Sequence, residues 1–136
     1  AADISAEKNK SRPNVEDIIN LQNFKTGALI RWSAISGPLL AKTDLSVMEK
    51  YSSALGLAFQ IQDDILDVEG NPSLIGKKTR KDETAGKATF ISTLGLEEAR
   101  RKAHELTDEA CDVISKLGPQ SKNLIDLANF VIHRKT

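Results

Sequence analysis

The run from Gly56 to Asp67 (GLAFQIQDDILD) constrains the fold more than any other stretch of this chain. On a helix, which turns by about 100° per residue, one narrow line collects small and polar side chains, and apolar residues cover the rest. That line contains Ser52, Gly56, Gln60, Asp63 and Asp67. Because this pattern is the inverse of a surface helix, we expect a helix that is packed on most sides and whose polar line faces a cavity.

The remaining chain has the pattern of further helices. Aromatic residues make up only 4% of the sequence, and the alternation typical of strands is scarce. We expect helices over residues 14–32, 43–68, 96–117 and 121–134, the first capped by Asn14. Gly37-Pro38, Gly70-Asn71-Pro72 and Gly118-Pro119 indicate turns, and residues 71–88 a loop rich in Gly, Lys and Thr. The expected fold class is therefore all-α.

Composition narrows the classes of function. The 136 residues fit a single domain. The chain has 19 Lys and Arg residues and 19 Asp and Glu residues, so its net charge is zero. This argues against a generic nucleic-acid binder, which usually has a basic excess. The single cysteine, Cys111, excludes an internal disulfide, argues against a cysteine-based zinc site and fits a cytoplasmic location. No apolar run approaches the roughly 20 residues of a membrane span.

Asp63 and Asp67 lie one turn apart near the end of their expected helix. Their like charges and the negative end of the helix dipole both destabilise that arrangement. A bound divalent cation would reverse both effects, and oxygen ligands without His or Cys favour Mg²⁺ over zinc. A solvated acidic helix end is the alternative interpretation, and the Asp-Asp-x-x-Asp motif alone does not decide between the two.

Cationic residues follow the carboxylates in the sequence. The segment 76–82 (GKKTRKD) begins about ten residues after Asp67, and Lys87 comes soon after it. Lysines beside a metal-binding carboxylate pair are what a Mg²⁺–diphosphate group would require, although an exposed charged loop is the alternative. Within the first helix, Gly27 would allow close backbone approach, so that the preceding Lys25 and Thr26 could face a cavity.

Taken together, these segments resemble the C-terminal half of trans-isoprenyl diphosphate synthases, and most of all the bacterial farnesyl diphosphate synthase branch. The matching stretches are 25–30 (KTGALI), 56–67, 76–77, 81–82, 86–89 (GKAT), 94–97 (LGLE) and 127–132 (LANFVI). The resemblance covers nearly the whole chain. It implies an all-α isoprenoid-synthase bundle around a deep cavity, commonly a homodimer.

The resemblance also implies a reaction, head-to-tail prenyl transfer. An allylic diphosphate, dimethylallyl or geranyl, ionises with the help of Mg²⁺, isopentenyl diphosphate attacks the cation, and a proton is lost. Asp63, Asp64 and Asp67 would form the second aspartate-rich motif and hold the metal. Lys25, Lys77 and Lys87 would bind the allylic diphosphate. Thr26 and Gln60, with Lys25, would act beside the reacting carbon, and Phe59 would shape the wall.

Departures from the family pattern are few within the chain. Arg80 stands where many members have Gly, and Ile91 where many have Pro. Residues 1–136 lack the N-terminal half of the family. That half would carry the first aspartate-rich motif with its arginines, the isopentenyl-binding residues and the residues that limit product length. We therefore expect the C-terminal part of one polyprenyl synthase domain, inactive without its other half and of undetermined product length. A non-catalytic helical subunit or regulatory partner is the alternative; a terpene cyclase is a weaker one.

Some residues carry no expected chemistry. We expect Trp32 and Cys111 to be packing residues, and His104 and His133 to lie at the surface. Leu57, Phe59 and Ile61 cannot all be buried within four helices, so an apolar surface should remain where the other half packs.

Overall fold

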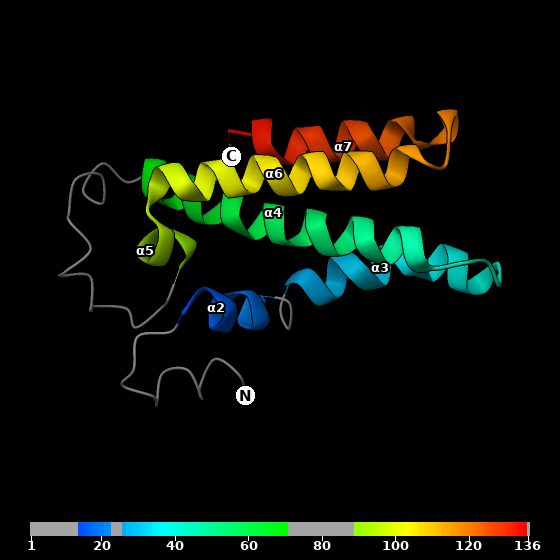
Figure 1. The fold of residues 1–136 in the computed structure, drawn as a ribbon, viewed down its shortest axis with the longest axis horizontal. Coiled ribbons are helices and arrows are strands. Elements are labelled where there is room, and N and C mark those ends of the chain that lie inside the picture. Colours follow the sequence, from blue (N-terminus) through cyan, green and yellow to red (C-terminus); the bar gives the residue numbers. More distant parts are fainter. Residues whose placement is uncertain (1–13, 23–25, 71–88, 136) are drawn as a thin grey trace.

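The computed structural model describes residues 14–22, 26–70 and 89–135. All regular structure in these ranges is helical, which confirms the all-α expectation. The elements are α2 (Val15–Gln22), α3 (Ala28–Leu40), α4 (Ser46–Gly70), α5 (Phe90–Leu94), α6 (Leu96–Ser115), the 3₁₀ turn η2 (Pro119–Ser121) and α7 (Lys122–His133). Figure 1 shows α4 in the middle of the molecule, with α6 and α7 on one side and α2 and α3 on the other.

Small side chains dominate the core that α4, α6 and α7 share. Ala58, Ala99, Ala110 and Ala128 are fully buried, and Ile61, Ile65 and Ile114 fill the space around them. Alanine lets neighbouring helix axes approach closely, because no atoms beyond Cβ hold them apart. Such a core leaves little room for larger side chains.

A buried tyrosine connects the beginning of α4 to α7. Tyr51 is 2% exposed, and its hydroxyl donates a hydrogen bond of 2.7 Å to the carbonyl oxygen of Leu124. Burial, with a smaller effect from the nearby Cys111, raises the pKa of Tyr51 to about 12. The phenol is therefore held in its neutral, hydrogen-bonding form throughout the physiological range.

The expected turn at Gly37-Pro38 is wrong, and so is the expected helix end near Trp32. Pro38 lies inside α3, which continues to Leu40. Proline's fixed φ fits a helix, and only one backbone hydrogen bond is lost there. The turn comes instead at Lys42, whose φ is 54°, and Thr43 closes it by donating its N–H to the carbonyl of Pro38 at 3.0 Å.

The helix caps are partly as expected. Asn14 and Asp17 form the expected N-terminal cap of α2: the Asp17 N–H donates to Asn14 Oδ1 at 2.9 Å, and the Asn14 N–H donates to Asp17 Oδ2 at 3.0 Å. Gly118 ends the α6 segment with a φ of 81°, which favours glycine. The short helix α5 was not expected. It begins at a capping box between Thr89 and Ser92.

Several large apolar side chains remain exposed. Trp32 is 60% exposed, so the expectation that it is a packing residue is wrong; Leu29, Leu40 and Phe130 are exposed as well. Ile61 is fully buried, whereas Leu57 and Phe59 are partly buried against the core. The exposed apolar surface therefore lies on α3 and α7 more than on α4.

The remaining surface expectations are confirmed. His104 and His133 are exposed, and Cys111 packs partly buried against the core. Among the described helices, none is both long and apolar enough to cross a membrane.

Candidate active site on helix α4

The line of small and polar residues on α4 meets a different neighbour at each turn. Ser52 and Gln60 are buried, Asp63 is partly exposed, and Asp67 is exposed. Ser52 lines a groove against α3, Gly56 touches the backbone of Gly27, and Asp63 pairs with Arg134. Within the described ranges, the line therefore borders several surfaces rather than one common pocket.

Gly27 and Gly56 bring α3 and α4 into close contact. A Cβ atom added at Gly56 would lie 3.4 Å from the Cα atom of Gly27, which is the lower edge of ordinary van der Waals contact. This confirms that Gly27 permits close backbone approach. Thr26, partly buried, precedes Gly27 in a wide π-helical turn at the start of α3. The contact thus anchors the Thr26 segment one turn before Gln60 on α4.

Gln60 has an unused hydrogen-bond donor. The residue is 7% exposed, and its Nε2 atom is buried without an acceptor among the described residues. A buried amide N–H group that lacks a partner costs free energy, so such groups are uncommon and often mark functional positions. The side chain is therefore suited to a polar ligand.

Asp63 pairs with a residue that directly follows α7. The Arg134 guanidinium donates through Nη2 to Asp63 Oδ1, across 71 residues of sequence. The same guanidinium carbon lies 4.3 Å from the centroid of the Phe59 ring, one helical turn before Asp63. Arg134 therefore contacts α4 through both a carboxylate and an aromatic ring.

Asp64 has a different environment from the other two carboxylates. It is 8% exposed, and its Oδ2 accepts a 2.9 Å hydrogen bond from the backbone N–H of Phe90, the first residue of α5. Phe90 itself is buried in the core. Asp64 thus attaches the segment that follows residues 71–88 to α4, while Asp63 and Asp67 lie closer to the surface.

Asp63 and Asp67 fit the needs of a magnesium ion. They are carboxylates one helical turn apart, and Mg²⁺ is commonly held by one or two carboxylates together with substrate phosphates and water. No group of three or more His, Cys, Asp or Glu residues is arranged as a metal site in the part of the chain that the structure describes. Two carboxylates on one face are thus the available donor set.

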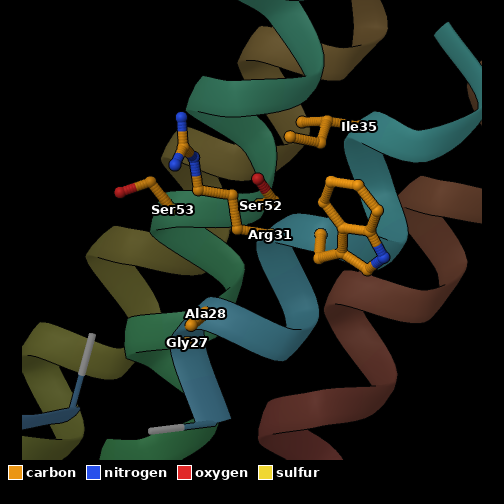
Figure 2. A pocket seen from close by; sticks show the side chains of 7 residues that line it. Gly27, Ala28, Arg31, Ile35, Ser52 and Ser53 are labelled. Atoms are coloured by element: carbon orange, nitrogen blue, oxygen red, sulfur yellow. The ribbon is translucent and has the colours of Figure 1, made fainter. Parts of the chain in front are cut away.

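Two hollows lie beside α4. The first, of about 440 Å³, lies between α3 and α4 and is bordered by Gly27, Ala28, Arg31, Trp32, Ile35, Ser52 and Ser53 (Figure 2). Arg31 there donates to Glu49 at 2.6 Å. The second, of about 350 Å³, lies between the end of α4 and the end of α7. Gln62, Glu69, Arg100, Arg134 and Lys135 are among the residues around it.

The described residues include only part of the expected site. Thr26, Gln60, Asp63, Asp64 and Asp67 are described, and all but Thr26 lie on two adjacent turns of α4. Lys25, Lys77 and Lys87, the expected diphosphate ligands, lie outside the described residues, as does the loop over 71–88. The pair between Arg134 and Asp63 was not predicted from the sequence, since no local periodicity connects the two residues.

The fold is that of an isoprenoid synthase, and the chain belongs to the polyprenyl synthetase family, whose sequence model matches residues 1–123. Farnesyl diphosphate synthase from Escherichia coli (strain K12) is 41% identical to it, covering 98% of this chain and 46% of that protein. Farnesyl diphosphate synthase from Bacillus subtilis (strain 168) is 35% identical, with 98% and 45% covered. The resemblance to farnesyl diphosphate synthases is confirmed.

Relatives with other names and a solved structure extend the comparison. Geranylgeranyl diphosphate synthase from Cyanophora paradoxa is 36% identical, with 97% of this chain and 45% of that protein covered. The apo structure of an FPP/GFPP synthase from Zymomonas mobilis matches with a TM-score of 0.79 at 33% identity, covering 96% of this chain and 42% of that one. The chain thus spans about half the length of the relatives it matches.

Proposed function

We propose that this chain is the C-terminal part of a short-chain trans-prenyl transferase of the cytoplasm. Its substrates are an allylic diphosphate, dimethylallyl or geranyl, and isopentenyl diphosphate, which it joins head to tail. The observation that carries the proposal is the line on α4, on which the buried Gln60 Nε2, with no acceptor among the described residues, precedes Asp63 and Asp67. Membership of the polyprenyl synthetase family supports the same chemistry.

The carboxylates have a defined task in this reaction. Asp63 and Asp67 would hold Mg²⁺ through their oxygen atoms, and Asp64 completes the motif and attaches the beginning of α5. When bound, Mg²⁺ neutralises charge on the departing diphosphate, which is the main electrostatic requirement of allylic ionisation. Lys25, Lys77 and Lys87 bind the remaining diphosphate charge.

Thr26 and Gln60 are suited to the carbocation side of the reaction. Both side chains are neutral dipoles, so their oxygen atoms stabilise a positive carbon without forming the covalent adduct that a carboxylate could form. The close contact between Gly27 and Gly56 fixes the spacing between their two helices. The Gln60 N–H₂ group remains available to donate to the substrate.

The complete site requires more than residues 1–136. We propose that an N-terminal half of the same domain packs against this chain and supplies a second metal cluster and the isopentenyl-binding residues, and that the whole enzyme is a homodimer. The exposed side chains of Leu29, Trp32 and Phe130 support such a covering partner. This chain alone is then inactive.

The test is product formation by the full-length protein. Geranyl diphosphate and ¹⁴C-labelled isopentenyl diphosphate are incubated with it and Mg²⁺, and the prenyl products are separated by chain length. We expect a Mg²⁺-dependent C15 or longer diphosphate, lost with EDTA and restored by Mg²⁺. A non-catalytic subunit would give no product under any metal condition, which would overturn the proposal.

A further inference from the structure

Arg134 occupies a defined seat on α4, here called the Arg134 seat and formed by Asp63 and Phe59. The side chain of Arg134 is 14% exposed and that of Asp63 is 44% exposed. The guanidinium donates to Asp63 Oδ1 and stacks over the Phe59 ring at 4.3 Å. The carboxylate that we assign to the metal therefore already has a cationic partner, from the residue that follows α7.

The Arg134 seat is incomplete as a hydrogen-bonding site. Arg134 Nε is buried and has no acceptor among the described residues. Arginine carries five N–H donors, and a buried donor without a partner destabilises the conformation in which it is buried. A guanidinium held by one carboxylate and one ring can thus leave more readily than one held by a complete set of acceptors.

We propose that Arg134 is the resident counter-ion of Asp63, and that Mg²⁺ and the guanidinium exchange on this carboxylate. The inference rests on the proposed function, because it takes Asp63 as a metal ligand. With Arg134 seated, the Asp63 charge is neutralised and α4 is relieved of part of the repulsion between Asp63 and Asp67. Arg134 is a positioning residue that sets how readily Asp63 accepts the metal.

Exchange has a measurable consequence for affinity. Suppose that a ligand binds only the molecules in which Asp63 is released from Arg134. Its apparent dissociation constant is then the intrinsic constant divided by the fraction of such molecules. Removing the guanidinium should therefore tighten metal binding in the absence of substrate. Couplings of this kind commonly amount to about 5- to 150-fold, so we expect a change of at least about fivefold.

The first experiment titrates Mn²⁺ into the full-length protein without substrate and measures free Mn²⁺ by electron paramagnetic resonance. Arg134→Gln should bind at least about fivefold more tightly than the wild type. Lys135→Gln is the matched control, because it removes the same charge from the exposed neighbouring residue. Equal tightening in both variants would reduce the effect to general electrostatics and overturn the inference, as would weaker binding by Arg134→Gln.

A second experiment follows a signal of the wild-type protein, and a variant serves only to assign that signal. In ¹⁵N-arginine-labelled protein, the Nε–H signal that is missing from Arg134→Gln identifies Arg134. We expect this signal to be slowly exchanging without metal, since the atom is buried, and to shift and exchange faster as Mg²⁺ is added. A signal unchanged at saturating Mg²⁺ would overturn the inference.

Asp63→Asn separates failure of this inference from failure of the proposed function. If Mn²⁺ binds the wild type and Asp63→Asn loses that binding, the metal site stands and the Arg134 results alone decide the exchange. If Asp63→Asn binds Mn²⁺ as the wild type does, Asp63 is not a ligand, and both the proposed metal site and the exchange are wrong.

Discussion

The backbone N–H of Phe90 donates to the carboxylate of Asp64 at 2.9 Å, across 26 residues of sequence and within the protein interior. The bond fixes the beginning of α5 to the same turn of α4 that carries Asp63. The middle carboxylate of the motif thus attaches α5 to α4. The substitutions below are made in the complete enzyme proposed above, which combines this chain with an N-terminal half.

Removing the acceptor at position 64 should loosen α5. Asp64→Leu leaves the Phe90 N–H buried without a partner, which we expect to lower the free energy of unfolding by about 1–3 kcal/mol. Urea denaturation measures this change, and amide exchange at Phe90 should accelerate. Asp64→Asn retains an acceptor oxygen and should lose less than half as much. Equal losses in the two variants would show that the hydrogen bond contributes little.

Removing the Asp63 carboxylate should abolish most turnover. Asp63→Ala deletes the proposed oxygen ligand of the metal that would stabilise the departing diphosphate, and we expect kcat to fall by at least about 100-fold. Steady-state assays at saturating Mg²⁺ measure the effect. Asp108→Ala, at an exposed position of α6, is the control and should leave turnover unchanged. Turnover like that of the wild type would show that Asp63 is not a metal ligand.

Tyr51 should make stability fall at alkaline pH. Its pKa is about 12 in the folded protein and about 10 when unfolded, so between these values the unfolded chain binds fewer protons. The neutral phenol therefore contributes roughly 2–3 kcal/mol to the free energy of unfolding. This contribution is fully present below pH 10 and is lost as the pH rises to 12. Tyr51→Phe lacks this titration, although it also lacks the hydrogen bond to Leu124.

The wild type should therefore be more stable than Tyr51→Phe at moderate pH and less stable at high pH. Near pH 8 we expect the wild type to be more stable than Tyr51→Phe by about 1 kcal/mol, and above about pH 11 less stable. Chemical denaturation at a series of pH values measures the difference. A constant difference from pH 8 to pH 12 would contradict the raised pKa.

The alanine core should tolerate no enlargement. Ala58→Leu inserts atoms where the residue is fully buried, and we expect destabilisation of about 1–3 kcal/mol. Ala41→Leu, at an exposed position after α3, is the matched control and should change stability by less than about 0.5 kcal/mol. Melting curves of both variants decide whether the close packing of α4 is as tight as its small residues indicate.

Trp32, the single tryptophan, should report on the proposed partner half. It is 60% exposed, so in this chain alone a 5-fluorotryptophan label should give a ¹⁹F signal typical of a solvated ring. Adding an unlabelled N-terminal half should shift and broaden that signal as the apolar face of α3 is covered. A signal unmoved by the partner, in a mixture that forms prenyl product, would place the interface elsewhere.

Much of the fold follows from local sequence. The 3.6-residue period identified α4, α6 and α7, and Asn14, Gly70 and Gly118 marked three of the ends, because caps and stops act within a few residues. Gly37-Pro38 misled the prediction, since a proline that costs one hydrogen bond can remain in a helix. The five-residue helix α5 is too short for periodicity to reveal, although its capping box is visible at Thr89 and Ser92.

The candidate site, too, could be predicted only where it depends on local sequence. The spacing of Gln60, Asp63 and Asp67 placed them on one line because they share a helix. The hydrogen bond from Phe90 to Asp64 and the pair between Arg134 and Asp63 join residues that are distant in sequence. Contacts of that kind depend on how the helices pack, which the sequence pattern of one helix does not contain.

The alanines in the core fix the rotation of α4 about its own axis. Turning a helix by one residue position changes the direction of every side chain by about 100°, and a core built from Ala58, Ala99 and Ala110 has no spare volume for such a turn. A redesign of the groove between α3 and α4 can therefore treat the orientation of α4 as fixed. A new shape for the groove between α3 and α4 must come from replacing side chains of α3 that line it, such as Trp32 and Ile35, while the orientation of Asp63 and Asp67 stays constant.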